Sequence, residues 1–207
     1  MPAVPWPLPD RRRVLENGKV RLVPLDVAAH GAGLYRAASL ETNGEDIFLY
    51  HLGSGPFADE GQFRPYLEAR APRSGELTFT VFSKRWDQIV GAATLMNLRP
   101  EHGSVEVGSI WYTKKAQRTE VNTNTMHLLF SYVFEELKYR RLEWKCNNEN
   151  EASKRAALRL GFQYEGLFRQ HFWDKGKNRD TAWFSIIDGD WPAVRTRFES
   201  LLFRPEI

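Results

Sequence analysis

The chain is poor in several features on which whole classes of protein depend. Its single cysteine, Cys146, excludes an internal disulfide and a zinc site built from cysteines. It has no apolar run of transmembrane length and no signal-peptide core, so we expect a cytoplasmic protein. No spacing of His, Asp and Glu suggests a metal site, and the G-x-x-x-x-G-K-[ST] phosphate loop is absent. These absences disfavour metal chemistry and phosphoryl transfer.

What the chain does contain is typical of a globular protein. It has 207 residues, 42% of them apolar and 27% charged, which is enough for one well-cored domain. The 13 Phe, 7 Trp and 7 Tyr are more aromatic residues than a disordered chain carries. The net charge of +3 is small, and acidic residues accompany the basic ones throughout, which makes nucleic acid an unlikely main partner.

The N-terminal segment differs in composition from the rest. Residues 1–18 form an irregular arm, because the prolines of PAVPWPLPD favour extended backbone. Arg11, Arg12 and Arg13 follow, and they read either as a solvated charge run or as a nucleic-acid-binding arm. Residues 19–203 carry no internal repeat and no second boundary, so we expect a single domain there.

Periodicity and turn residues predict an α/β order of elements. Three strands in a meander, followed by a helix and a strand, indicate one parallel strand pair within a largely antiparallel sheet. The expected strands are 19–25, 77–83, 89–98, 104–112, 141–146, 163–173 and 181–187, and the expected helices are 28–38, 58–69, 123–137, 150–160 and 191–202.

The stretch from Ser104 to Leu137 organises the chain. Its first part alternates, which places Val105, Val107, Ser109 and Trp111 on one face of a strand and Glu106, Gly108, Ile110 and Tyr112 on the other. In its last part, apolar residues recur at helical spacing, namely Met126, Leu129, Phe130, Val133 and Leu137.

A polar turn from Lys114 to Asn122 joins this strand to the helix. The first turn of a helix has unpaired backbone N–H groups and the positive end of the helix dipole, which together favour an anion. Lys114, Lys115 and Arg118 add positive charge just before the helix. We therefore predict that the turn binds a phosphate-bearing ligand.

Two motifs resemble the GCN5-related N-acetyltransferases. The run Gln117-Arg118-Thr119-Glu120-Val121-Asn122 is similar to the pyrophosphate loop of that family, [QR]-x-x-G-x-[GA], with Glu120 and Asn122 where small residues are usual. The pattern N-x-x-S-x(7)-G-F, here from Asn150 to Phe162, is similar to its C-terminal half. The segments around both motifs resemble the branch that contains the ribosomal-protein alanine N-acetyltransferases, over roughly residues 19–200.

The resemblance implies a fold and a cosubstrate. In this family a mixed, mostly antiparallel central sheet flanked by helices has one parallel strand pair that splays apart, and acetyl-CoA lies between the two strands. Pantetheine amides would pair with the strand at Ile110, Trp111 and Tyr112, and the diphosphate would lie on residues 117–122. The resemblance thus implies acetyl-CoA as cosubstrate, no metal, and direct transfer of the acetyl group to an amine.

Three residues are candidates for the chemistry that such a transfer needs. Glu106 is the candidate general base, because it lies on a central strand on the face of Gly108, where a ligand has room. Ser153, carried over from the family motif, would protonate the departing thiolate, unless it only caps its own helix. Asn150 would hydrogen-bond pantetheine or serve as a helix cap. Ala157 replaces the tyrosine acid of other branches.

We therefore expect an N-acetyltransferase that acts on a primary amine, either a peptide N-terminus or a small aminoacyl compound. The alternative is a non-catalytic module of the same fold that binds CoA or another nucleotide, which Glu120 and Asn122 in the loop would favour. No membrane partner is expected, and either a monomer or a homodimer is compatible with the sequence.

Overall fold

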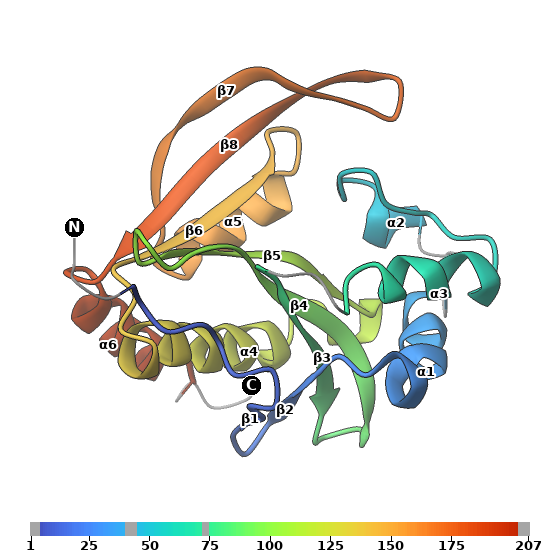
Figure 1. Ribbon diagram of the computed structural model, residues 1–207, viewed down its shortest axis with the longest axis horizontal. Helices are drawn as coiled ribbons and strands as arrows, with labels where there is room; N and C mark the ends of the chain where they lie inside the picture. Colours follow the sequence, from blue (N-terminus) through green and yellow to red (C-terminus); the bar gives the residue numbers. More distant parts are fainter. Residues whose placement is uncertain (1–4, 40–44, 72–74, 203–207) are drawn as a thin grey trace.

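The computed structural model describes residues 5–39, 45–71 and 75–202, which form one curved sheet with helices on both faces (Figure 1). The strands of the sheet are β1 (Leu15–Glu16), β2 (Val20–Pro24), β3 (Leu77–Ser83), β4 (Gln88–Arg99), β5 (Ser104–Tyr112), β6 (Arg141–Asn147), β7 (Gln163–Asp174) and β8 (Lys177–Ile187). The helices are α1 (Val27–Ser39), α2 (Glu45–Phe48), α3 (Glu60–Glu68), α4 (Glu120–Ser131), α5 (Glu151–Arg159) and α6 (Trp191–Leu202). A short 3-10 turn, η1 (Lys114–Ala116), precedes α4, and a π-helical segment, η2 (Tyr132–Glu136), continues it.

The strand order confirms the expected topology. The eight strands lie in the order β1-β2-β3-β4-β5-β6-β8-β7, and the β3-β4-β5 meander is antiparallel. Only β5 and β6 run parallel, joined by the crossover through α4. The fold is therefore the predicted mixed α/β sheet with a single parallel pair.

Several boundaries differ from the prediction. Strand β8 begins at Lys177, four residues before the expected start, because Lys175 and Gly176 alone make the turn, both with positive φ. Helix α4 begins at Glu120, three residues before the expected start, where Thr119 caps it and accepts a hydrogen bond from the N–H of Val121. Part of the arm, Leu15–Glu16, pairs with β2 as β1. Residue 203, the expected end of the domain, lies outside the described residues.

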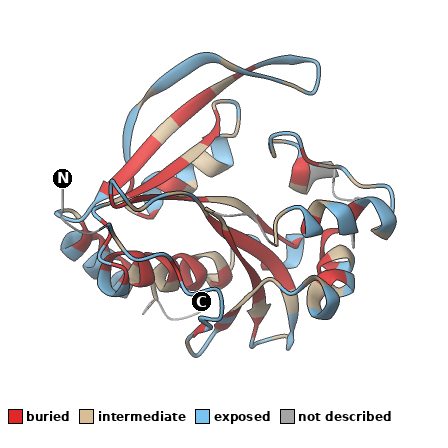
Figure 2. Cartoon of the chain, viewed as in Figure 1, coloured by how far each residue is buried: buried red, intermediate tan, exposed pale blue. Residues whose placement is uncertain are grey.

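Two hydrophobic clusters lie on opposite faces of the sheet. On one face α4 buries the predicted apolar stripe, and all five of its residues are buried: Met126, Leu129, Phe130, Val133 and Leu137. On the other face α1, α2 and α3 cover a smaller cluster that is rich in aromatic rings. Figure 2 shows that β8 is largely buried whereas β7, at the edge of the sheet, is exposed along most of its length.

A β-bulge in the middle of β5 reverses the side-chain alternation. Gly108 lies opposite Thr94 and Trp111 lies opposite Ala92, so β5 carries one extra residue there, and Ser109 has a φ of 46°. As a result Trp111 belongs to the aromatic cluster and Tyr112 packs on the α4 face with Val107. The predicted faces of these two residues were wrong, because strict alternation assumes a strand without a bulge.

Candidate active site

The parallel strands β5 and β6 pair over a very short distance. Only residues 104–106 of β5 pair with residues 141–143 of β6. Beyond Glu106 two carbonyl groups of β5 accept hydrogen bonds from side chains instead. The Ile110 carbonyl is 3.3 Å from His51 Nε2, and Gln117 Nε2 donates to the Tyr112 carbonyl at 3.1 Å. The side chains of Trp111 and Tyr112 are buried, so only their backbone atoms are available to a ligand between the strands.

The turn before α4 has the geometry of an anion site. Arg118 adopts a left-handed conformation with a φ of 61°, and Thr119 Oγ1 donates to the Ala116 carbonyl at 2.7 Å. These features end η1 and start α4 within three residues, so the first backbone N–H groups of a 12-residue helix face the turn. Gln117 and Arg118 are exposed there, and Glu120 is the first residue of the helix. The residues present therefore fit a diphosphate group.

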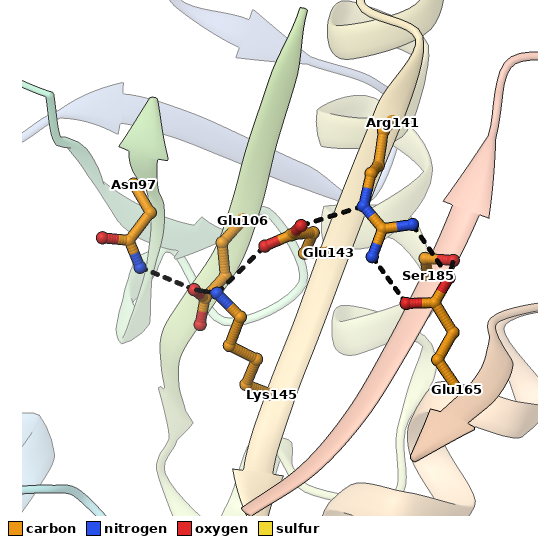
Figure 3. A network of polar contacts seen from close by, with 7 residues as sticks. All are labelled: Asn97, Glu106, Arg141, Glu143, Lys145, Glu165 and Ser185. Carbon is orange, nitrogen blue, oxygen red and sulfur yellow. Dashed lines mark hydrogen bonds and ion pairs between the residues drawn. The ribbon is translucent and has the colours of Figure 1, made fainter. Parts of the chain in front are cut away.

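Glu106 lies in a network of polar side chains on the face of the sheet opposite α4 (Figure 3). Its Oε2 accepts hydrogen bonds from Lys145 Nζ at 2.7 Å and from Asn97 Nδ2 at 2.7 Å. Its Oε1 has no hydrogen bond among the described residues and lies 3.3 Å from the position that a Cβ would take at Gly108. One carboxylate oxygen thus fixes the side chain, and the other makes no hydrogen bond among the described residues. Met96 Sδ lies 2.7 Å from the same Cβ position, so the room expected for a ligand at Gly108 is filled by the Met96 side chain.

Lys145 connects this carboxylate to the rest of the network. Its ammonium group also contacts Glu143 Oε2 at 2.9 Å and lies 3.9 Å from the centroid of the Trp183 ring. Arg141 then bridges Glu143 to Glu165, which also accepts a hydrogen bond from Ser185. The charges therefore alternate in sign from β5 to β7 across the sheet.

The pKa values of Glu143 and Glu165 follow from these contacts. Burial alone would raise the pKa of Glu143, but hydrogen bonds from Arg141 and Lys145 outweigh it, and the net effect is a lowered pKa. The hydrogen bonds from Arg141 lower the pKa of Glu165 to about 2. Both carboxylates are therefore ionised at neutral pH and hold Arg141 and Lys145 in place.

Asn150 and Ser153 lie at the start of α5, directly after β6. Asn150 is the N-cap, and its Oδ1 accepts a hydrogen bond from the Ser153 N–H at 3.0 Å. The Ser153 hydroxyl accepts a hydrogen bond from Trp144 Nε1 at 3.0 Å, a bond that does not use its own O–H. The capping role of Asn150 is thus visible in the fold, while the Ser153 hydroxyl is oriented by Trp144.

The two predicted catalytic residues lie on opposite faces of the sheet. Lys145 contacts Glu106, while the preceding residue, Trp144, contacts Ser153. Successive side chains of a strand point to opposite faces, so the space between β5 and β6 separates Glu106 from Ser153. A group that enters between the strands would meet one residue from each side.

The tip of the β7–β8 hairpin contacts the loop that follows α2. Lys175 Nζ donates to the carbonyls of Phe48 at 2.6 Å and Leu49 at 3.2 Å. Arg179 Nη1 donates to the Tyr50 carbonyl at 3.2 Å, and Asp174 Oδ1 accepts from the Gly53 N–H at 3.1 Å. We call these contacts the clasp. It joins the sheet edge to the loop that carries His51.

His51 is held as a neutral imidazole. Burial, opposed by the hydrogen bond to Ile110 and assisted by the neighbouring cations Arg70, Lys175 and Arg179, lowers the pKa of His51 to about 4. A carbonyl can only accept, so Nε2 carries the proton and donates to Ile110.

This shift predicts a pH-dependent stability. Unfolded chains protonate His51 near its ordinary pKa of 6.5, whereas the folded protein does so only near pH 4. Between these values the unfolded state binds more protons, so the free energy of unfolding should fall as the pH drops from 6.5 to 4. His51→Gln keeps an N–H donor for Ile110 but cannot titrate. Urea unfolding across this range should show a shallower decline in the variant, and equal declines in both proteins would contradict the expectation.

Four residues that matter to this geometry were not predicted as site residues: His51, Asn97, Lys145 and Arg179. Lys145 could have been found, because β6 alternates charged Arg141, Glu143 and Lys145 with apolar Leu142, Trp144 and Cys146. Three charges on one face of a central strand indicate a covered polar network. The role of His51 depends on the clasp, a contact between distant segments that no local pattern indicates.

A polar hollow of about 780 Å³ opens at the end of β6, and none of the predicted site residues lines it; its lining consists of Asn147, Asn148, Glu149, Arg169, Gln170, Asn178 and Asp180. In the part of the chain that the structure describes, no group of three or more His, Cys, Asp or Glu side chains could hold a metal ion. Within the same residues no helix is long and apolar enough to cross a membrane.

Two solved structures that are similar to this chain over most of its length are described as acetyltransferases of one family. A GCN5-related N-acetyltransferase from Brucella melitensis shares 40% identity with a TM-score of 0.91, over 96% of this chain and 88% of that one. A probable acetyltransferase of the GNAT family from Chromobacterium violaceum ATCC 12472 shares 34% identity with a TM-score of 0.84, over 92% and 93% of the two chains.

Residues 22–163 match the Acetyltransferase (GNAT) domain, and the chain belongs to that family of acetyltransferase enzymes. The ribosomal-protein-serine acetyltransferase of Escherichia coli (strain K12) is 26% identical over 92 residues, 44% of this chain and 50% of that protein. YdaF of Bacillus subtilis (strain 168) is 28% identical over 103 residues, 50% of this chain and 56% of YdaF. The chain thus spans about half the length of these relatives, and the predicted resemblance to the family is confirmed.

Proposed function

We propose that this protein transfers an acetyl group from acetyl-CoA directly to a primary amine, either a peptide N-terminus or a small aminoacyl compound. Family membership supports acetyl-CoA as the cosubstrate. The observation that carries the proposal is the early separation of β5 from β6, which leaves residues 110–112 beside the α4 turn without a neighbouring parallel strand. Pantetheine would pair with the β5 backbone there, and the diphosphate would lie on residues 117–122.

In this proposal the residues on the two sides of the separated strands have different tasks. Glu106 Oε1 takes a proton from the acceptor ammonium, directly or through water. The free amine attacks the thioester carbonyl carbon and forms the C–N bond, the attacking nitrogen loses its second proton to solvent, and the C–S bond breaks. Ser153 gives a proton to the departing thiolate and regains one from solvent. Asn150 caps α5 and so holds Ser153 beside Trp144.

A panel of amines incubated with acetyl-CoA tests the proposed reaction. Release of free thiol should require a primary amine and should be accompanied by a matching acetylated product. If acetyl-CoA binds but no amine of the panel is acetylated, the proposed reaction is wrong. A non-catalytic module is not favoured, since the similar proteins from Escherichia coli, Brucella melitensis and Chromobacterium violaceum are all described as acetyltransferases.

Arg118→Ala should weaken CoA binding only a few-fold. The exposed guanidinium of Arg118 contributes a screened charge, of the order of 1 kcal/mol or less. The backbone N–H groups of α4 would provide most of the diphosphate contacts and remain in the variant. Isothermal titration calorimetry with CoA measures the change, and Arg64→Ala on α3 provides a matched exposed arginine. Loss of all detectable binding in Arg118→Ala alone would show that the side chain, and not the backbone, holds the diphosphate.

A further inference from the structure

Four buried polar atoms of the β7–β8 hairpin have no hydrogen-bond partner among the described residues. They are Arg179 Nε, Thr181 Oγ1, Trp183 Nε1 and His171 Nδ1. Arg179 and Thr181 are only 8% and 1% exposed. Buried polar atoms are almost always paired, and leaving one unpaired is costly, so several together on one hairpin indicate a missing partner.

These atoms lie on the face that carries Glu106. In the β6–β8 register Lys145 lies opposite Trp183 and Asn147 opposite Thr181, and residues 179, 181 and 183 share one face by alternation. Lys145 contacts both the Trp183 ring and the Glu106 carboxylate. Residues 183, 181 and 179 therefore form a row along β8, which begins beside Glu106 and ends at Arg179 and the clasp.

The chemistry of the row selects an oxygen-bearing ligand. The N–H groups of Arg179 Nε and Trp183 Nε1 can only donate hydrogen bonds, and the Thr181 hydroxyl can donate as well. Their partner must therefore supply acceptor oxygens. The Arg179 end of the row carries two cations, Arg179 and Lys175, with Asp174 Oδ2 3.9 Å from Arg179 Nη1, and this excess of positive charge disfavours a second ammonium group at that end of the ligand.

We propose that Thr181 and Trp183 on the inner face of β8 bind the carbonyl oxygen adjacent to the acceptor amine, with Arg179 farther along the strand beside a second oxygen of the acceptor. The inference rests on the proposed acetyl transfer and deepens it. It makes amines with a neighbouring carbonyl or carboxylate good acceptors, and simple alkylamines and polyamines poor ones. The oxygen can belong to an amide, as at a peptide N-terminus, or to the carboxylate of a free amino acid.

Three small acceptors compare an amide, a carboxylate and a group without oxygen beside the amine. Alaninamide carries an amide beside its amine, alanine carries a carboxylate, and isopropylamine has a methyl group in the same place. We expect kcat/KM, calculated on the free-amine concentration, to be roughly tenfold or more higher for alaninamide or alanine than for isopropylamine. A tripeptide amide that begins with alanine tests whether more of the peptide adds to the preference.

Conservative variants test the residues. Trp183→Phe removes the N–H but keeps a ring for Lys145, and Thr181→Val removes only the hydroxyl. Each should lower kcat/KM roughly tenfold for the carbonyl-bearing acceptor, through KM, and leave isopropylamine and acetyl-CoA affinity unchanged. Trp173→Phe makes the same chemical change on the same hairpin at a side chain that is 72% exposed, and it should have no effect.

Calorimetric titration of the acceptors into the CoA complex keeps the inference testable without turnover. The inference is supported if alaninamide, alanine or the tripeptide amide binds, and binds more weakly to Trp183→Phe and Thr181→Val. This holds even if no amine is acetylated, because absence of acetylation would refute only the proposed reaction. Turnover without any preference for a neighbouring carbonyl, or with equal losses for isopropylamine in the variants, would overturn the inference alone. Absence of both binding and turnover would overturn both.

Discussion

Glu106→Gln should lower kcat/KM for acetyl transfer by roughly 10²-fold, the low end of the contribution of a general base. The acceptor amine arrives protonated, since a Lys-like amine has a pKa near ~10.4 and an α-amine near ~8. Glu106 Oε1 lies on the Gly108 face and makes no hydrogen bond among the described residues. The glutamine amide has the same shape but cannot accept the proton, so acetyl-CoA affinity should hardly change.

The pH dependence distinguishes this role from a structural one. As the pH rises the free amine becomes common, so the deficit of Glu106→Gln should shrink. Measurement of kcat/KM against pH, with acetyl-CoA affinity determined separately by calorimetry, tests this directly. Full activity of Glu106→Gln at neutral pH would remove Glu106 from the mechanism and leave it a structural carboxylate held by Lys145 and Asn97.

Two further variants serve as controls for the same experiment. Glu143→Gln makes the identical change at the other carboxylate that contacts Lys145. Glu143 contacts only the side chains of Lys145 and Arg141 among the described residues and is not the proposed base, so this variant should affect turnover only slightly. Ser153→Ala should cost less than Glu106→Gln, since water can protonate the thiolate. A larger loss in Glu143→Gln than in Glu106→Gln would mean that the intact network, and not the Glu106 oxygen, supports activity.

Lys145→Met should destabilise the fold by about 3 kcal/mol, because removal of one partner leaves buried charges of the other sign uncompensated. The lysine side chain is 13% exposed, and each of the carboxylates that it contacts is 8% exposed. Glu143 would keep Arg141, but Glu106 would keep only the amide of Asn97. Urea unfolding monitored by circular dichroism measures the loss.

A double variant separates charge from packing in this prediction. If the uncompensated carboxylate is the cause, adding Glu106→Gln to Lys145→Met should restore part of the lost stability. Lys177→Met removes an ion pair of 2.9 Å with Glu149, but that side chain is 60% exposed and its charge is screened by water, so the urea midpoint should not shift measurably. An equally small loss in Lys145→Met would show that the network contributes little to stability.

Much of this fold could be predicted because its signals are local. The apolar stripe of α4, the alternation of β3 and the Asp190-Trp191-Pro192 start of α6 each specify an element without reference to the rest of the chain. The crossover rule then makes β5 and β6 parallel. The general bases, acids and cosubstrate contacts named from the sequence remain predictions, since they depend on a ligand.

What could not be predicted depends on contacts between distant residues. The bulge at Ser109 follows Gly108, and an isolated glycine in a strand can mark a bulge, but the exchanged faces of Trp111 and Tyr112 depend on the pairing of β5 with β4. Lys145 meets Glu106 across 39 residues of sequence, and Lys175 meets Phe48 across 127. Such pairs follow from the order of strands and from the length of the hairpin, not from any motif.

The clasp also bears on how acceptor preference can change in evolution. Asp174, Lys175 and Arg179 bind backbone amide and carbonyl groups of residues 48–53, never their side chains. Substitutions in that loop can therefore alter its surface while the hydrogen bonds that tie it to the hairpin persist. Exposed loop side chains such as Leu49 and Leu52 can change without releasing the loop from the hairpin, whereas Phe48, which is buried, and His51, which contacts the Ile110 carbonyl, are held by the fold.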